Sequence, residues 1–235
     1  MPKTGGTSIR KQIEQYRRPE ESSYIYKLCR RFGFADTYPF YDFFHRPHTT
    51  LSKAKLLLGE KAYAKLFVFA VAREPVDWLC SCYKFFRLGN STIKGRKTNK
   101  INSFSEYVDA MISLEHSKPC QAYLLIDNTG ALLVDAIGHF DHLETFCSQI
   151  HNKLGFNAIK LPHLNTNNFT ANDLKADIAT NSSLEEKIKR AWALDFEIWD
   201  LVQEKSSDLR YHKLHHPISA YAKLTDYDPW GMFNW

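Results

Sequence analysis

The chain has few cysteines and no long apolar segment, and each shortage excludes a class of protein. No run of apolar residues is long enough to span a bilayer, which argues against a membrane-spanning protein. No secretory hydrophobic region precedes the first polar motif, so we expect a cytoplasmic protein. The five cysteines include no Cys-x-x-Cys pair and leave one without a mate, which predicts reduced thiols in place of a disulfide framework.

The bulk composition fits one folded domain with an anionic partner. The 235 residues, of which 44% are hydrophobic, suffice for a single α/β core. The net charge of +5 suits an anionic nucleotide or acceptor but does not single out nucleic acid, and we predict no nucleic-acid partner. We expect the domain to cover residues 1–205 and the remaining residues, 206–235, to form a tail without an assigned role.

The first ten residues have the composition of a phosphate-binding loop. Two glycines let backbone N–H groups converge on an oxyanion, and a helix expected over 8–17 adds the positive end of its dipole. The predicted ligands are Lys3, Thr4, Gly5, Gly6, Thr7 and Ser8. The lysine precedes the glycines, which excludes the nucleotide-kinase loop with its terminal Gly-Lys pair. A Gly-Gly pair before a helix is more often a plain turn, so a second motif is needed.

The second motif lies at residues 66–87. The apolar run 66–72 has the length and composition of a strand, and Arg73-Glu74-Pro75 leads from it into a helix expected over 76–87. Ser81 follows Arg73 by eight residues. An arginine gives a charged fork to a phosphate dianion and a serine adds a hydroxyl, although an arginine at a strand end is more often a surface ion pair.

In this order, the two motifs resemble those of the sulfotransferases that use 3′-phosphoadenosine 5′-phosphosulfate (PAPS). The form Pro-Lys-Thr-Gly-Gly-Thr-Ser is similar to the carbohydrate type, which includes the heparan and uronic-acid 2-O-sulfotransferases. The resemblance extends over roughly residues 2–205, with less specific matches in His-Thr-Thr at 48–50, the segment 125–135, Leu-Pro-His-Leu-Asn at 161–165 and Asp195-Phe196. Glu74 departs from the Asn or Asp usual before the proline, and we expect the site to tolerate it.

The resemblance implies an α/β fold with a P-loop-like parallel sheet flanked by helices. It also implies a transferase that moves a sulfuryl group from PAPS to a hydroxyl of a carbohydrate or similar acceptor, without a metal. The glycine loop would hold the 5′-phosphosulfate, and Lys3 would stabilise the leaving phosphate as its charge develops. Arg73 and Ser81 would bind the 3′-phosphate.

The general base is less clearly marked, because ten histidines are present. His48 is our first candidate, since it lies between the two phosphate motifs where relatives of the 2-O-sulfotransferases have a histidine before a helix. His45 is the second, and a carboxylate is the alternative, at Asp36 or Asp42. Three further histidines have no spacing that assigns them to a substrate site: His139, His142 and His163.

The loop lacks the strand that normally precedes it. In α/β nucleotide folds a buried strand aims the glycine loop, and here only Met1 stands before Pro2. Three explanations stay open at this point: the sequence is truncated at its start, its start has been placed too late, or the sheet lacks its usual first strand. Two other functions stay open: a truncated or degenerate relative that binds the nucleotide without turnover, and an ATP-dependent P-loop kinase, which the order of the loop residues disfavours.

Local signals predict the remaining elements. We expect a helix over 52–64 with Ser52 as its cap and a break at Gly59, and a helix over 103–113 opened by Ser103. A hairpin is expected over 124–136, around the turn 128–130. The last two predictions are a helix over 142–154 ended by Gly155 and one long helix over 184–205.

Overall fold

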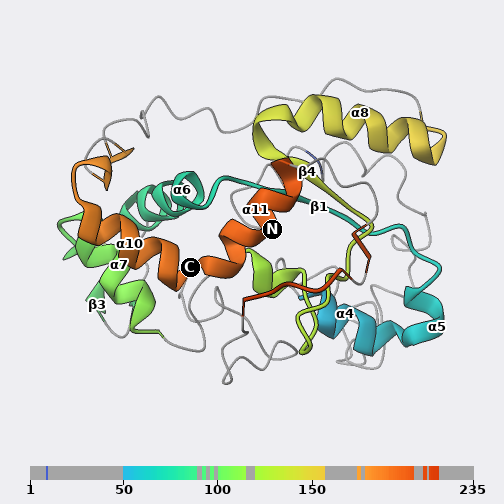
Figure 1. Ribbon diagram of the computed structural model, residues 1–235, viewed down its shortest axis with the longest axis horizontal. Coiled ribbons are helices and arrows are strands. Elements are labelled where there is room, and N and C mark those ends of the chain that lie inside the picture. The colour runs from blue at the N-terminus through green and yellow to red at the C-terminus, as the bar shows by residue number, and fades with distance from the viewer. Residues whose placement is uncertain are drawn as a thin grey trace, which may run out of the picture.

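The computed structural model describes Ile9 and most of the chain between residues 50 and 216 (Figure 1). The described ranges are 50–88, 92–93, 96–97, 100–114, 120–156, 174–175, 178–203, 209–210 and 212–216. None of the helices within these ranges is both long and apolar enough to cross a membrane.

Two short parallel strands form the centre of the fold. Strand β1 (Phe69–Ala72) pairs with β4 (Ala136–His139) in a register that sets Phe69 opposite Ala136 and Ala72 opposite His139. Both strands therefore end at the same edge. The expected mixed α/β architecture, with a parallel sheet flanked by helices, is confirmed at this level, whereas the P-loop-like topology stays a prediction.

Helices cover the two faces of the strands, and neighbouring residues of β1 show the division. Val71 belongs to a cluster with Phe146 and Ile150 of helix α8 (Leu143–Leu154). The next residue, Ala72, packs into the main core. Successive side chains of a strand point to opposite faces, so α8 lies on one face and the main core on the other. In Figure 1 α8 lies at the top of the view, above β1 and β4.

Four helices supply much of the main core. They are α6 (Pro75–Leu88), α7 (Phe104–Ile112), α10 (Ser182–Ala191) and α11 (Ala193–Gln203). The fully buried residues Trp78, Tyr107, Ile188 and Ile198 come one from each of them. A short antiparallel ribbon, β2 (Thr92–Ile93) with β3 (Arg96–Lys97), lies between α6 and α7 in the sequence.

Glycine at position 138 lets α8 approach β4 closely. A Cβ added to Gly138 would lie 2.2 Å from the Phe146 ring, far inside the contact distance of two carbon atoms. Only a residue without a side chain fits between this strand and this helix.

Several helix boundaries match the predictions, and two do not. Ser103 caps α7, Gly155 ends α8 with a φ of 72°, and Gly59, with a φ of 77°, separates α4 (Leu51–Leu58) from α5 (Glu60–Tyr63). The predicted cap Ser52 is wrong, because the Thr50 side chain accepts the Lys53 N–H at 3.1 Å and Ser52 lies inside the helix.

The prediction of one long helix over 184–205 is also wrong. The chain bends at Trp192, which lies between α10 and α11 and has a ψ of 31°. The expected hairpin over 124–136 forms only as a tight turn, in which Ile126 and Leu132 make an isolated bridge. Its first residue, Leu124, ends the 3-10 helix η6 (Ala122–Leu124).

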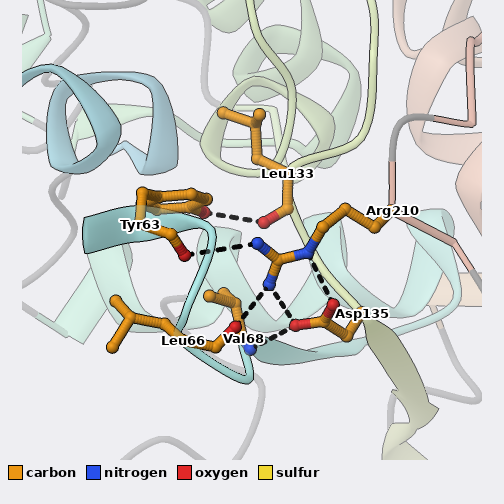
Figure 2. Close-up of polar contacts among 6 residues, drawn as sticks. All are labelled: Tyr63, Leu66, Val68, Leu133, Asp135 and Arg210. Atoms are coloured by element: carbon orange, nitrogen blue, oxygen red, sulfur yellow. Dashed lines mark hydrogen bonds and ion pairs between the residues drawn. The ribbon is translucent and has the colours of Figure 1, made fainter. Parts of the chain in front are cut away.

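The segment 209–216 packs against the rest of the fold. Leu209 and Leu214 are buried in the main core, and Lys213 forms an isolated bridge with Ala131. Arg210 lies beside the starts of β1 and β4, where it binds Asp135 and the carbonyl of Leu66 (Figure 2). This part of the predicted tail therefore belongs to the folded body.

Candidate functional site

The candidate site lies at the carboxyl edge of the two strands. Arg73 and Glu74 follow β1 directly, and the 3-10 helix η7 (Phe140–His142) follows β4. Because the strands are parallel and in register, these two exits lie side by side. The carboxyl edge of parallel strands is where α/β folds place their ligands.

The Arg73 guanidinium is the centre of this site. Its Cζ lies 4.7 Å from the centroid of the Phe140 ring, in a cation–π contact. Its Nε is buried and has no hydrogen-bond partner within the described part of the chain. A buried charged donor without a partner is costly, and such groups are rare in native structures unless a ligand or water meets them.

The main chain at Arg73 is held by the side chain of Gln121. The Arg73 N–H donates to Gln121 Oε1 at 3.1 Å, and Gln121 Nε2 donates to the Arg73 carbonyl at 2.9 Å. Gln121 is only 2% exposed and is held in turn by Asp195, whose Oδ2 accepts the Gln121 N–H at 3.0 Å. The sequence analysis missed Gln121, because no local pattern marks a residue 48 positions beyond Arg73.

Glu74 caps helix α6. Its carboxylate accepts the N–H of Val76 at 3.0 Å and the N–H of Asp77 at 2.7 Å. Asn or Asp is the usual cap at such a position, and the longer Glu74 performs the same task. The departure at Glu74 thus has a structural role, and it leaves the Arg73 side chain outside any ion pair among the described residues.

Ser81 lies on α6, in a partly buried position. It lies in the second turn of the helix, seven residues beyond Glu74, which precedes the helix. Tyr83, the aromatic residue after the serine, is buried and packs its ring against Phe104 and Tyr107 at 5.5 and 5.2 Å. Tyr83 is therefore a core residue.

Ile9 is the described residue that adjoins the glycine loop. It packs against the cluster of Val71, Phe146 and Ile150, and Phe140 packs against the same cluster. The other predicted site residues lie outside the described residues: Lys3, Thr4, Gly5, Gly6, Thr7, Ser8, Asp36, Asp42, His45, His48 and His163.

A cavity of about 600 Å³ runs along β4, the strand that pairs with β1. All four residues of β4 line it, although alternate strand residues point to opposite faces, so the edge of the strand opens to the cavity. Phe67 and Phe146 supply apolar wall, and Lys153 lies over the Phe67 ring at 4.4 Å. The volume lies in the range of small-molecule sites.

Two histidines line the cavity near Phe140. The His139 ring lies 4.9 Å from the His142 ring and 4.3 Å from the Trp199 ring. Burial lowers the pKa of His139 and the neighbouring Asp141 opposes this, so the ring is neutral near pH 7. His139 Nδ1 accepts the Asp141 N–H at 3.0 Å, which assigns the proton to Nε2. His139 therefore offers a hydrogen-bond donor and is poorly suited to act as a base.

The described cysteines are unsuited to nucleophilic chemistry. Cys80, Cys82, Cys120 and Cys147 are free and buried. Burial, with a contribution from Asp77, raises the pKa of Cys80 to about 12, and burial raises that of Cys147 to about 11. Both stay protonated at neutral pH.

Comparison of the chain with protein-family models, with curated proteins and with solved structures gave no match. Among the residues that the structure describes, no three histidine, cysteine or acidic side chains are grouped so that they could hold a metal ion. The site is therefore defined by its own geometry: an arginine donor without a partner among the described residues, an aromatic ring against its guanidinium, and a cavity along the neighbouring strand β4.

Proposed function

We propose that the protein is a PAPS-dependent sulfotransferase that acts on a hydroxyl of a carbohydrate or similar acceptor. The observation that carries the proposal is the Arg73 guanidinium at the carboxyl edge of β1, with its Nε buried and without a partner among the described residues. A 3′-phosphate would supply the missing acceptor. A charge-assisted bond of this kind is among the stronger hydrogen bonds in proteins.

Two further observations support a nucleotide at this position. Glu74 occupies the N–H groups at the start of α6, so an anion at this edge relies on Arg73 and on Ser81 further along the helix. Ile9 packs in the cluster that also supports Phe140, which is what a glycine loop close to Arg73 requires of the next residue. Lys3, Thr4, Gly5, Gly6, Thr7 and Ser8 are the proposed ligands of the 5′-phosphosulfate.

The reaction would transfer one sulfuryl group. The acceptor oxygen forms a bond to sulfur, its proton passes to a general base, and the bond from sulfur to the 5′-phosphate oxygen breaks to release adenosine 3′,5′-bisphosphate. Lys3 would stabilise the charge on that oxygen. His48 stays our candidate for the base, with His45, Asp36 and Asp42 as alternatives. The acceptor would enter from the side of the cavity along β4.

Calorimetric titration of the full chain tests the donor assignment. Adenosine 3′,5′-bisphosphate should bind more tightly than adenosine 5′-phosphate or ATP, because only the first presents a 3′-phosphate to Arg73. Equal affinity for the three nucleotides would overturn the proposal, and a preference for ATP would favour a kinase.

A transfer assay with PAPS and a panel of hydroxylated carbohydrates tests the reaction. Lys3→Ala should lower turnover more than it lowers donor affinity, since its contact strengthens in the transition state. His48→Ala should spare donor binding and lower transfer by about 10²–10⁴-fold. Tight binding of the bisphosphate without any transfer would favour the alternative, a relative that binds the nucleotide without turnover.

A further inference from the structure

The side chain of Gln121 forms hydrogen bonds with the main chain of Arg73 in the way that the backbone of a neighbouring strand would. Its side-chain amide accepts the Arg73 N–H and donates to the Arg73 carbonyl, at 3.1 and 2.9 Å. These bonds form at the residue directly after β1, where the pairing with β4 has ended. The backbone from which the guanidinium extends is thus fixed on both of its polar groups.

Gln121 is itself held in a rigid setting. The buried Asp195 carboxylate, 1% exposed, accepts the N–H of Gln121, the N–H of Ala122 at 2.8 Å and the Cys120 thiol at 2.8 Å. Three donors on one buried carboxylate leave it a single orientation. Asp195 lies on α11, so the loop before η6 is anchored to a core helix.

The Arg73 side chain is supported by a different residue, Phe140. Its ring lies under the guanidinium, whose Nε has no other partner among the described residues. We propose that Gln121, held by Asp195, is a positioning residue that fixes Arg73 for the 3′-phosphate, while Phe140 sets the plane of its guanidinium. The inference rests on the proposed function, because the contacts of Gln121 and Phe140 with Arg73 have this purpose only if Arg73 binds the 3′-phosphate.

The experiment compares Gln121→Met with Tyr63→Phe in the full chain. Gln121→Met keeps the length of the side chain and removes both bonds to Arg73. Tyr63→Phe is the matched control, since it removes another buried hydrogen bond, from the Tyr63 hydroxyl to the Leu133 carbonyl at 2.7 Å, beside Arg210 at the starts of the strands and not at the end where Arg73 lies. Gln121→Glu is a second variant of nearly the same shape, which keeps the acceptor of the Arg73 N–H and replaces the donor to the Arg73 carbonyl by a second acceptor.

The readout is the ratio of the affinities for adenosine 3′,5′-bisphosphate and adenosine 5′-phosphate, which a loss of stability alone does not change. Gln121→Met should lower this ratio about tenfold, and Gln121→Glu should lower it in the same direction. Tyr63→Phe should leave it unchanged. In an Arg73→Ala background Gln121→Met should have no further effect on the ratio. A ratio that survives both Gln121 substitutions would overturn the proposal.

A second measurement separates this inference from the proposed function. If the unaltered protein shows no preference for the 3′-phosphate, the proposed function fails. The positioning role is then judged without a ligand, from the Arg73 Nε–Hε signal in ¹⁵N NMR spectra. An ordered signal that is lost in Gln121→Met supports positioning, and a signal that is the same in both proteins overturns it.

Discussion

The two ends of the small sheet each have an arginine, and the two are bound in opposite ways. At the starts of β1 and β4, Arg210 forms a two-pronged contact with Asp135, donates to the Leu66 carbonyl at 2.8 Å and lies over the Tyr63 ring (Figure 2). At the ends of the strands, Arg73 has an aromatic ring and a buried Nε without a described partner.

The difference separates a structural arginine from the one that we propose binds a ligand. Arg210 joins segments that are far apart in the sequence, and its partners use its donors within the protein. Arg73 is fixed through its main chain, and its Nε has no partner among the described residues. A buried arginine donor that lacks a partner in the described part of the chain is costly, and such groups are typical of sites that bind a ligand.

The largest effect should come from Arg210→Met. The substitution leaves Asp135 partly buried without its cation, and breaking such a pair from one side costs about 3–5 kcal/mol. Urea unfolding should show this loss, while the preference for the 3′-phosphate should stay as it was. A loss below about 1 kcal/mol would mean that the pair behaves as an exposed one.

Glu197 on α11 binds His215 and His216 and so also attaches the segment 212–216 to the fold. This contact should weaken in acid. Partial burial acts to raise the pKa of Glu197, but the bonds from His216 and His215 outweigh it and bring the pKa down to about 2. A carboxyl whose pKa is lower in the folded state stabilises the fold above its ordinary pKa, and loses this contribution as the pH falls toward about 2.

The size of this contribution is about 2 kcal/mol, discounted because both histidines are exposed. Unfolding of the protein and of Glu197→Gln should be compared between pH 6 and pH 2. The stability difference between them should shrink as the pH falls below about 4.5. A constant difference would contradict the assignment to Glu197.

Arg73→Ala should act on binding and not on stability. Removing the guanidinium should weaken the binding of adenosine 3′,5′-bisphosphate by about 1.5–3 kcal/mol more than it weakens the binding of adenosine 5′-phosphate. The unfolding free energy should change by less than about 1 kcal/mol, since no ion pair of Arg73 is found among the described residues. Ser81→Ala should shift binding in the same direction. A large loss of stability with unchanged binding would mean that Arg73, like Arg210, has a structural role.

The smallest effect is expected for Glu74→Ala, which removes the cap of α6. Loss of a side-chain cap costs about 1 kcal/mol. Thermal unfolding should show the loss, and Glu74→Asp should restore part of it. If Glu74→Ala instead abolished the preference for the 3′-phosphate, Glu74 and not Gln121 would be the residue that positions Arg73.

The sequence predicted best what short-range patterns determine. Gly59 and Gly155 end helices because each has a positive φ that other residues avoid, and a local pattern is enough to find them. The strand before Arg73 and the helix after Pro75 were found in the same way. The cap of α4 was predicted wrongly as Ser52, because the extended backbone that makes Thr50 the cap, with φ −69° and ψ 151°, is not visible in the sequence.

The missed features depend on residues far apart in the chain. Strand β4 has four residues, one of them glycine, and becomes a strand by pairing with β1, which lies 67 positions earlier. Gln121 and Phe140 have no recognisable pattern of their own, because their importance comes from lying beside Arg73. The break at Trp192 was missed because the apolar pattern continues through it into α11.

Gly138 has a consequence for how this site can change. The missing side chain there sets the gap between β4 and α8, and one wall of the cavity, including Phe146, is built on α8. The strand leads two residues later to Phe140, the ring under Arg73. A single methyl group at position 138 would therefore reshape the cavity and shift the support of the arginine together, so neither can be tuned at this position without the other.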